Sequence, residues 1–380
     1  MALNYSLGEE IDDAVLDLIH RVGRNHSPHI IREIATTALK LVEDNASRGD
    51  LKIINSSLKE MRYAFRLFAP FRAYRKVSIF GSARLMPDSA DYRLAETLSA
   101  QLVRQGFLAI TGAGPGIMEA GNRGAGEGGS FGLGIRLPME PDSNPFIQRP
   151  DRLINFKYFF TRKLIFIKES DAFVLFPGGF GTMDECFELL TLLQTGKCDP
   201  RPVVLMDPPG SAYWRDWHHF VRTRLADRGL IDPRDLALLT HTSDAGKAIA
   251  EIRSFYSNYH SSRYIGDRLL IRLENEPTDE QLAEWSLRFQ DLMTKGGITR
   301  TPLPEEDRED PLLKQLHGVQ LHFNRRNFAR LRELIDALNG YTREGWADQA
   351  GREPSLAAGL EDEGGDGEPA GTGETTLPDV

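Results

Sequence analysis

The sequence predicts an α/β fold in which a doubly wound parallel sheet follows a helical N-terminal segment and precedes a small α+β module. The main observation is a series of short apolar runs that stop just before glycine, proline or aspartate: KVSIF (76–80), FLAIT (107–111), AFVLF (172–176) and PVVLM (202–206). The intervals carry helical periodicity, at 90–105, 116–125, 155–169, 182–195 and 213–228. Strands separated by helices are typical of a parallel sheet with helices on both faces.

The pattern changes three times along the chain, which predicts four parts. These are a helical segment, the sheet domain, the α+β module and a disordered acidic tail, at 1–72, 73–257, 258–344 and 345–380. Within the module we expect strands and helices at 268–274, 279–293, 319–323 and 326–339. The tail is rich in Gly, Glu, Pro and Ala, a composition that buries too little apolar surface to fold.

Composition excludes several classes of protein. No stretch approaches the roughly 18 consecutive apolar residues of a membrane span, and the acidic start of the chain lacks the apolar core of a signal peptide. The formal net charge is −9, but residues 361–380 hold seven acids and no lysine or arginine, so the rest of the chain is close to neutral. We therefore expect a soluble cytoplasmic protein that binds neither membranes nor nucleic acid.

Cysteine and histidine give no sign of a disulfide framework or a metal site. Cys186 and Cys198 are the only cysteines, and the adjacent His218 and His219 lie in an ordinary amphipathic helical pattern. We expect two reduced, partly buried thiols, histidines that pack, no metal and no cofactor.

Two glycine-rich loops follow predicted strands. The first lies in TGAGPGIMEAGNRGA (111–125), which is neither a dinucleotide fingerprint nor a Walker loop, and the second in PGGFGT (177–182). Backbone N–H groups of such a loop, together with the positive end of the following helix, can hold a phosphate. Two loops at one sheet edge predict a site for a mononucleotide or a sugar phosphate.

Glu185 has two interpretations. Thr182-Met183-Asp184-Glu185 has the form of a capping box, which predicts a helix that begins near Thr182 with Glu185 turned back to its start. Asp184 and Glu185 would then also complement the helix dipole. Alternatively, Glu185 is a catalytic carboxylate one turn from the phosphate loop. The two interpretations are compatible, because a cap would hold the carboxylate beside a bound phosphate.

Several motifs resemble those of the Lonely Guy family, the cytokinin-activating phosphoribohydrolases that are often named as lysine decarboxylases. PGGFGTMDE (177–185) resembles the family's PGGxGTxxE motif, and FFTRK (159–163) resembles its Arg-Lys motif on the preceding helix. IFGSAR (79–84) and ITGAGPGIMEAGNRGA (110–125) match its first two strand-end loops. The resemblance covers about residues 72–257 and implies a Rossmann-like nucleotide-binding catalytic domain, here within a long bacterial type of chain.

The resemblance also implies an activity and a site. The reaction is hydrolysis of the N-glycosidic bond of nucleoside 5′-monophosphates, of the AMP or cytokinin ribotide type, to free base and ribose 5-phosphate. The catalytic residues map onto Arg162 and Glu185. Substrate contacts map onto Gly81, Ser82, Gly112, Gly114, Met118, Glu119, Asn122, Lys163, Gly178, Gly179, Gly181 and Thr182. The family further implies a homo-oligomer, a dimer or a multiple of one, with active sites near the subunit interface.

Alternatives stay open at this point. Arg162 also fits a solvated basic helix face, and Lys163 fits either a substrate contact or a structural ion pair. The loops fit a non-catalytic nucleotide or molybdenum-cofactor carrier, and the flanking parts fit a nucleotide-sensing regulator. In an enzyme, Glu185 would stabilise an oxocarbenium ion or activate water. It would act either as a nucleophile or as a base. Arg162, a permanent cation, would orient Glu185, bind substrate oxygens or offset charge on the departing base.

Overall fold

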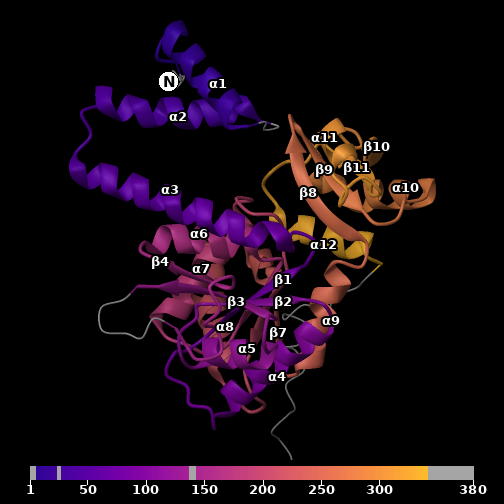
Figure 1. Ribbon diagram of the computed structural model, residues 1–380. Helices are drawn as coiled ribbons and strands as arrows, with labels where there is room; N and C mark the ends of the chain where they lie inside the picture. The colour runs from indigo at the N-terminus through magenta and orange to yellow at the C-terminus, as the bar shows by residue number, and fades with distance from the viewer. Residues whose placement is uncertain (1–5, 24–26, 137–142, 341–380) are drawn as a thin grey trace, which may run out of the picture.

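The computed structural model describes residues 6–23, 27–136 and 143–340, so the tail predicted at 345–380 lies outside the described residues. Its centre is a seven-stranded parallel sheet in the order β4-β3-β2-β1-β5-β6-β7 (Figure 1). The strands are β1 (Lys76–Phe80), β2 (Leu108–Thr111), β3 (Ser130–Ile135), β4 (Leu153–Phe156), β5 (Ala172–Leu175), β6 (Val203–Met206) and β7 (Leu239–Thr242). The predicted α/β fold class is confirmed.

Helices cover both faces of the sheet, because successive strand side chains point to opposite faces. Phe173 and Leu175 of β5 belong to one core, and Ala172 and Val174 belong to the other. The first core is covered by α3 (Arg48–Phe68), α6 (Phe159–Glu169), α7 (Phe180–Gln194) and α8 (Tyr213–Phe220). The second is covered by α4 (Ala90–Arg104), α5 (Ile117–Ala125) and α9 (Ala245–Phe255).

The strand order creates a switch point between β1 and β5. The chain runs from β1 through β2 and β3 to β4 on one side, and from β5 through β6 to β7 on the other. The loops that leave β1 and β5 therefore diverge, and ligands bind at such points, beyond the carboxyl ends of the strands. Gly81 follows β1 and Gly178 follows β5, so the glycine loops border this crevice.

Several predicted element boundaries are corrected. The helix predicted at 155–169 begins only at Phe159, because Leu153–Phe156 pairs with β3 as the edge strand β4. The helix predicted at 213–228 ends as α-helix at Phe220 and continues as a π-helix over Val221–Ala226. β3 and β7 were not predicted, because SFGLGI is interrupted by glycines and LTHT is largely polar.

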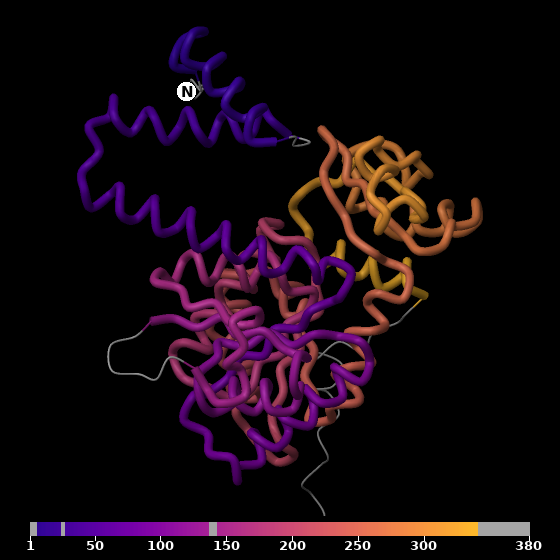
Figure 2. The backbone as a smooth tube through the Cα atoms, viewed as in Figure 1, coloured from indigo at the N-terminus to yellow at the C-terminus, as the bar shows by residue number. Residues whose placement is uncertain are grey.

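The N-terminal segment is helical, as predicted. It consists of α1 (Glu9–Val22), α2 (Pro28–Glu43) and α3, followed by a 3₁₀ turn at Ala69–Phe71. Ala64 and Phe68 bury the end of α3 against the sheet domain, whereas α1 and α2 project away from it (Figures 1 and 2). None of the helices among the described residues combines the length and apolar character needed to cross a membrane.

The C-terminal module is a four-stranded antiparallel sheet, β10-β11-β9-β8, with short helices. Its elements are β8 (Tyr259–Ile265), β9 (Arg268–Leu273), α10 (Asp279–Arg288), a 3₁₀ turn at Gln290–Leu292, β10 (Thr299–Thr301), α11 (Glu305–Glu309), β11 (His317–Leu321) and α12 (Phe328–Leu338). The predicted strands and helices correspond to β9, α10, β11 and α12, and β8 is added by a largely polar stretch.

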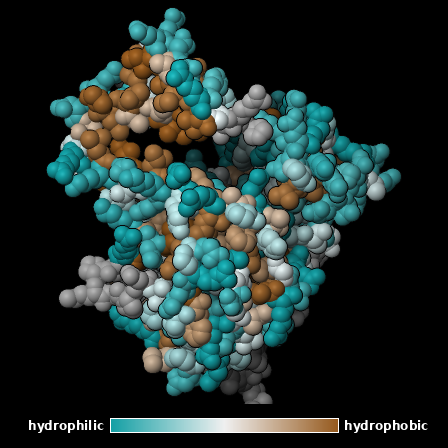
Figure 3. Space-filling view, viewed as in Figure 1, coloured by the Kyte–Doolittle hydropathy of each residue, from teal (hydrophilic) through white to brown (hydrophobic). Residues whose placement is uncertain are grey.

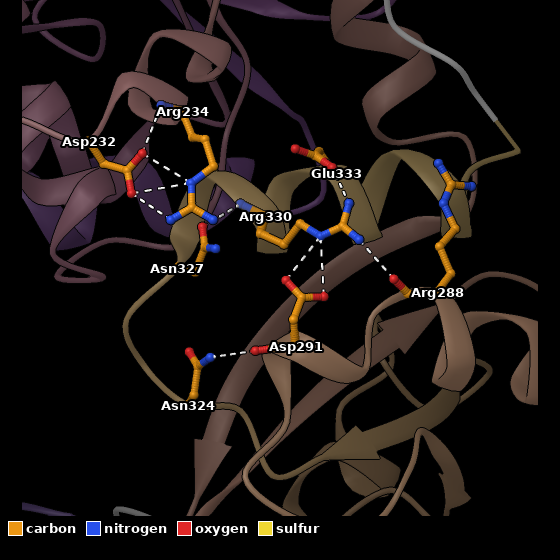
Figure 4. Close-up of polar contacts among 8 residues, drawn as sticks. All are labelled: Asp232, Arg234, Arg288, Asp291, Asn324, Asn327, Arg330 and Glu333. Carbon is orange, nitrogen blue, oxygen red and sulfur yellow. Dashed lines mark hydrogen bonds and ion pairs between the residues drawn. The ribbon is translucent and has the colours of Figure 1, made fainter. Parts of the chain in front are cut away.

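The helix α12 joins the module to the sheet domain. Arg332 is buried, and its guanidinium lies 2.8 Å from Glu251 of α9 and 3.0 Å from Asp336. Arg330, which is more exposed, pairs with Asp291 at 3.3 Å and donates to the Arg288 carbonyl at 2.8 Å (Figure 4). The same close-up shows the Asp232–Arg234 pair of the sheet domain beside the start of α12.

Candidate functional site

Three loops meet at the switch point, and Ser82 joins them. Its backbone N–H donates to the Pro177 carbonyl at 3.0 Å, and its carbonyl accepts from the Ile117 N–H at 3.0 Å. The loop after β1 therefore connects the loop before α5 to the loop before α7. The two glycine-rich loops recognised in the sequence thus lie on either side of one short backbone segment.

Three glycines are required by this close approach. Gly116 has a φ of +67°, and a Cβ there would lie 2.3 Å from the Ser82 carbonyl oxygen. A Cβ at Gly178 would lie 2.1 Å from the Thr182 hydroxyl. Gly81 is similarly crowded, since its Cβ would lie 2.7 Å from the Ile117 side chain. Any side chain at these positions would separate the loops.

The start of α7 differs from the prediction. The helix begins at Phe180 with Gly179 as its N-cap, and no side chain caps it. The predicted capping box is therefore wrong: Thr182 is buried in the first turn against Gly178, and Asp184 and Glu185 come after that turn. The helix starts two residues earlier than predicted because Gly179, with φ −90° and ψ −153°, occupies the N-cap position without a side chain. No side chain caps the first N–H groups of α7, and Phe180, its first residue, is 97% exposed.

Arg162 is held at the other side of the site by backbone carbonyls. It projects from α6, and its Nε donates to the Leu133 carbonyl of β3 at 2.7 Å and its Nη2 to the Gly112 carbonyl at 3.4 Å. A Cβ at Gly112 would lie 2.4 Å from that Nη2. Gly112 therefore makes room for the guanidinium. Arg162 is not a solvated surface residue.

Glu185 lies among cations and is largely buried, with 12% of its side chain exposed. Lys163 Nζ is 3.5 Å from its Oε2, and also 2.9 Å from Asp184 and 2.5 Å from Glu188. Burial raises the pKa of Glu185, although Lys163 and Arg162 oppose the rise. Burial lowers the pKa of Arg162, and Glu185 opposes that change. Each of the two groups therefore favours the charged form of the other.

Lys163 forms the structural ion pairs that were one of its two interpretations. Burial acts to lower its pKa, but contacts with Glu188, Asp184 and Glu185 outweigh this and raise the pKa overall. Its side chain, 14% exposed, links α6 to one face of α7. A direct contact of Lys163 with substrate stays a prediction.

The residues predicted on α5 fall into different surroundings. Met118 packs over the first glycine loop, because a Cβ at Gly114 would lie 2.7 Å from its methyl group. Glu119 instead accepts a hydrogen bond from the Tyr92 hydroxyl of α4 at 2.9 Å. Asn122 is completely buried, and its amide bonds Thr111, Ser130 and Asn144 at 2.7–2.9 Å. Asn122 thus supports the first glycine loop through buried hydrogen bonds.

Three supporting residues were missed. Glu188 pairs with Lys163, and its spacing of three residues from Glu185 on one helix contains the signal that would have found it. The Tyr213 hydroxyl donates to the Gly178 carbonyl from α8. The Asn144 amide donates to the carbonyls of Ala113 and Gly114 at 3.1 and 3.0 Å. Tyr213 and Asn144 follow no periodic pattern, so tertiary structure alone reveals them.

Other groups do not extend the site. Burial raises the pKa of Cys186 to about 12 and that of Cys198 to about 11, so both thiols are protonated at neutral pH. Within the described residues, no group of three His, Cys, Asp or Glu side chains is arranged to hold a metal. Two cavities of about 340 and 480 Å³ lie away from the β1–β5 switch point, the first beside Arg300 and His317 and the second beside Phe146, Arg152 and the predicted site residue Asn122. The chemistry therefore points to the switch point, although neither cavity lies there.

Comparison with known proteins finds one matching family model and several similar proteins. The family model described as possible lysine decarboxylase matches residues 118–252, which include Arg162, Lys163 and the whole PGGFGTMDE stretch. A relative from Mycobacterium tuberculosis, named cytokinin riboside 5′-monophosphate phosphoribohydrolase, is 35% identical over 108 residues, which cover 26% of this chain and 53% of the relative. The matched part of the chain is similar to the Lonely Guy family.

Other similar proteins match between about a third and a half of the chain. An Arabidopsis thaliana protein of the same name is 24% identical, over 48% of this chain and 83% of its own length. A pyrimidine/purine nucleotide 5′-monophosphate nucleosidase from Escherichia coli is 30% identical over 34% of this chain and 31% of its own. The match thus spans about half of the M. tuberculosis relative and about a third of the E. coli relative. Among solved structures, the molybdenum cofactor binding protein of Rippkaea orientalis aligns with a TM-score of 0.35 and 19% identity, over 48% of this chain and 96% of that one.

Proposed function

We propose that this chain hydrolyses the N-glycosidic bond of nucleoside 5′-monophosphates, of the AMP or cytokinin ribotide type, to a free base and ribose 5-phosphate. The observation that carries the proposal is the meeting of a buried Glu185, a backbone-clamped Arg162 and an uncapped helix start at one switch point. The names of the M. tuberculosis, A. thaliana and E. coli relatives describe this class of reaction.

The proposed phosphate site is the loop from Gly178 to Thr182. A Cβ added at Gly179 or Gly181 would meet no heavy atom within 4 Å, so a ligand can approach the backbone there. The uncapped N–H groups and the positive end of the α7 dipole both favour a dianion. We place the ribose between this loop and the backbone of Gly81, Ser82, Gly112 and Gly114.

Glu185 is the proposed catalytic carboxylate. Loss of the base leaves positive charge on the ribose ring, and a carboxylate beside C1′ stabilises that charge or activates the attacking water. Burial favours its neutral form, whereas Lys163 and Arg162 favour the ionised form that this role needs. The cations are therefore part of the mechanism, because without them a buried carboxylate would stay protonated at higher pH.

Arg162 is the proposed electrostatic partner. A guanidinium does not release its proton near neutral pH, so it is a poor general acid. Its bonds to the carbonyls of Leu133 and Gly112 fix the orientation of the cation before substrate arrives. In that position it orients Glu185, binds substrate oxygens or offsets negative charge on the departing base.

The proposal also covers the residues of α5, the location of the protein and its assembly. Met118 packs over the first glycine loop and Glu119 accepts a hydrogen bond from Tyr92; both are proposed to bear on base choice, while Asn122 positions the loop. We also propose a cytoplasmic location, because nucleoside monophosphates are cytoplasmic metabolites, and a homo-oligomeric assembly like that implied by the family resemblance.

Substitution of the two proposed catalytic residues tests this function. Glu185→Gln and Arg162→Ala should each lower kcat with AMP by two or more orders of magnitude, because each removes charge that is needed in the transition state. Glu96→Gln, which removes a carboxylate paired with Arg123 outside the site, is the matched control and should keep full activity. Unchanged turnover in both catalytic variants would overturn the site, and tight binding of AMP without turnover by the unaltered chain would overturn the enzyme.

A further inference from the structure

The N-terminal helices expose an unusual amount of apolar surface. We call residues 9–22, 28–43 and 48–58, which form α1, α2 and the first half of α3, the arm. Its large apolar side chains that are 39–84% exposed are Ile11, Leu18, Val22, Ile30, Ile31, Ile34, Leu39, Val42, Leu51, Ile53, Ile54 and Leu58. In Figure 3 this surface appears as brown patches on both sides of an open gap between α2 and α3. By contrast, the side chains that α1 and α2 do bury are Asp12 and Thr36.

The amount of exposed surface calls for a partner. A dozen half-exposed aliphatic side chains present on the order of 1,000 Å² per chain, above the roughly 300–600 Å² of the largest patch on a typical monomer. It also matches the roughly 800 Å² that each partner contributes to a standard interface. Helices of this length are marginal in water unless an apolar face is packed. Within the chain, α2 and the first half of α3 diverge from a short link at 44–47 (Figure 2).

The charges of α1 and α3 favour a second copy of the chain as that partner. α1 contains five acidic residues and one arginine, whereas the whole of α3 contains five lysines and arginines and two acids, with two of these cations and one of these acids in its first half. α2 lies between α1 and α3 in Figure 1, so the two charged helices do not meet within one chain. In a two-fold pair, the acidic helix of each copy can lie along the basic helix of the other, and every such contact occurs twice.

Two other occupants fit less well. Residues 341–380 of the same chain contain few large apolar side chains and many acids, so they cannot fill an aliphatic surface of this size. A membrane surface is disfavoured by α1, because helices that lie on membranes carry lysine and arginine on their polar face. The surface is apolar, carries both signs of charge on separate helices and has the size of a protein interface.

We propose that two copies of this chain dimerise by exchanging arms, with α1 and α2 of one copy packed against α3 of the other. The dimer would also support the proposed active site. Glu60 of α3 accepts hydrogen bonds from the Lys157 N–H at 2.8 Å and from the Thr161 hydroxyl at 2.5 Å, at the start of α6, the helix that carries Arg162. Packing of the arm steadies α3 and, through Glu60, the start of α6.

Sedimentation of the full chain, with a mass of 42.6 kDa, tests the proposal. At micromolar concentration we expect a dimer or a multiple of it. Ile54→Glu/Leu58→Glu should reduce the mass by whole copies or raise the dissociation constant at least tenfold. The exposed leucine Leu287 of α10 provides a control, since Leu287→Glu changes an apolar side chain outside the arm and should leave the mass unchanged.

A charge-reversal experiment provides a second test that does not depend on the folding of the apolar variants. Lys52→Glu/Lys59→Glu should weaken the dimer, and adding Glu10→Lys/Asp13→Lys in the same chain should restore it, because the two helices again carry opposite charge. Rescue would require that α1 and α3 meet between copies. The proposal would be overturned if the unaltered chain were monomeric. It would also be overturned if neither the apolar nor the charge substitutions changed the dissociation constant of the dimer.

Discussion

At the scale of single residues, the proposed site depends on neighbouring charged groups that influence one another's ionisation. Glu185 is buried enough to favour its neutral form, and two cations oppose this. One of them, Lys163, lies 3.5 Å away and is itself held by Asp184 and Glu188. The acidic cluster on α7 therefore positions a lysine, and the lysine tunes the carboxylate.

Lys163→Met should move the acid limb of the pH–rate profile upward. Removal of the cation removes an influence that lowers the pKa of Glu185, so this already raised pKa rises further. The ionised carboxylate then forms only at higher pH, and activity at pH 6 falls more than activity at pH 8. Lys197→Met, at an exposed site outside the cluster, is the control. A limb at the same pH in both variants would contradict the tuning role, whatever happens to KM.

Gly112→Ala should damage catalysis more than stability. The added methyl group would lie 2.4 Å from Arg162 Nη2 and 2.5 Å from Met118 Sδ, so the guanidinium or the loop must move. A misplacement of this size costs roughly 10- to 100-fold in kcat/KM. Gly49→Ala, in the exposed first turn of α3 with 3.5 Å to its nearest neighbour, is the matched control and should leave activity intact. An equally active Gly112 variant would show that the position of Arg162 is not critical.

At the scale of elements, α6 obtains its N-terminal support from another helix. No side chain of α6 caps its start at Tyr158, and its first turn has no acidic residue. Glu60 of α3 supplies both the acceptor and the negative charge. A carboxylate near a helix start is favourable through its hydrogen bonds and through the helix dipole.

Glu60→Gln should therefore destabilise the protein and weaken activity modestly. Loss of the charged acceptor should cost about 1–2 kcal/mol of unfolding free energy, since charge-assisted bonds exceed neutral ones. Urea unfolding measures this loss, and kcat should fall only a few-fold because Arg162 keeps its carbonyl partners. Glu43→Gln, on the exposed end of α2, should change neither value by more than the error. Identical stability of the two variants would remove Glu60 from the support of α6.

The elements also show what could be predicted from the sequence. Four strands could be predicted from the sequence: β1, β2, β5 and β6. Their residues are all buried, so these strands appear in the sequence as short, mainly apolar runs. β3, β4 and β7 were missed because glycines, a following helical pattern or polar residues obscure short strands. The start of α7 was misread because Thr182 and Glu185 fit a capping box by spacing alone, while the glycines allowed an earlier start. Tyr213 and Asn144 reach the site from distant elements, which no local pattern reports.

At the scale of the whole molecule, two attachments determine how the parts work together. The end of α3 packs on the sheet domain, and α12 packs the C-terminal module onto α7 and α9. The junction at α12 contains two arginines in different surroundings. Arg332 is 2% exposed beside Glu251 and Asp336, whereas Arg330 is 23% exposed beside partners that face solvent.

Substitution of these two arginines should show that the buried ion pair contributes more to the unfolding free energy than the surface pair does. Arg332→Met leaves two buried carboxylates without their guanidinium and should cost about 3–5 kcal/mol of unfolding free energy. Arg330→Met removes solvent-exposed pairs and should cost less than about 1 kcal/mol. Urea unfolding of the full chain measures both. Equal costs would show that the junction does not depend on the buried pair.

The proposed reaction at the switch point is cleavage of a glycosidic bond. Chromatography of the products after incubation of the full chain with 5′-AMP is the test of this reaction. We expect adenine and ribose 5-phosphate in equal amounts, with no phosphate released and no other substrate required. Adenosine and phosphate as products, or AMP recovered unchanged from a chain that binds it, would contradict the claim.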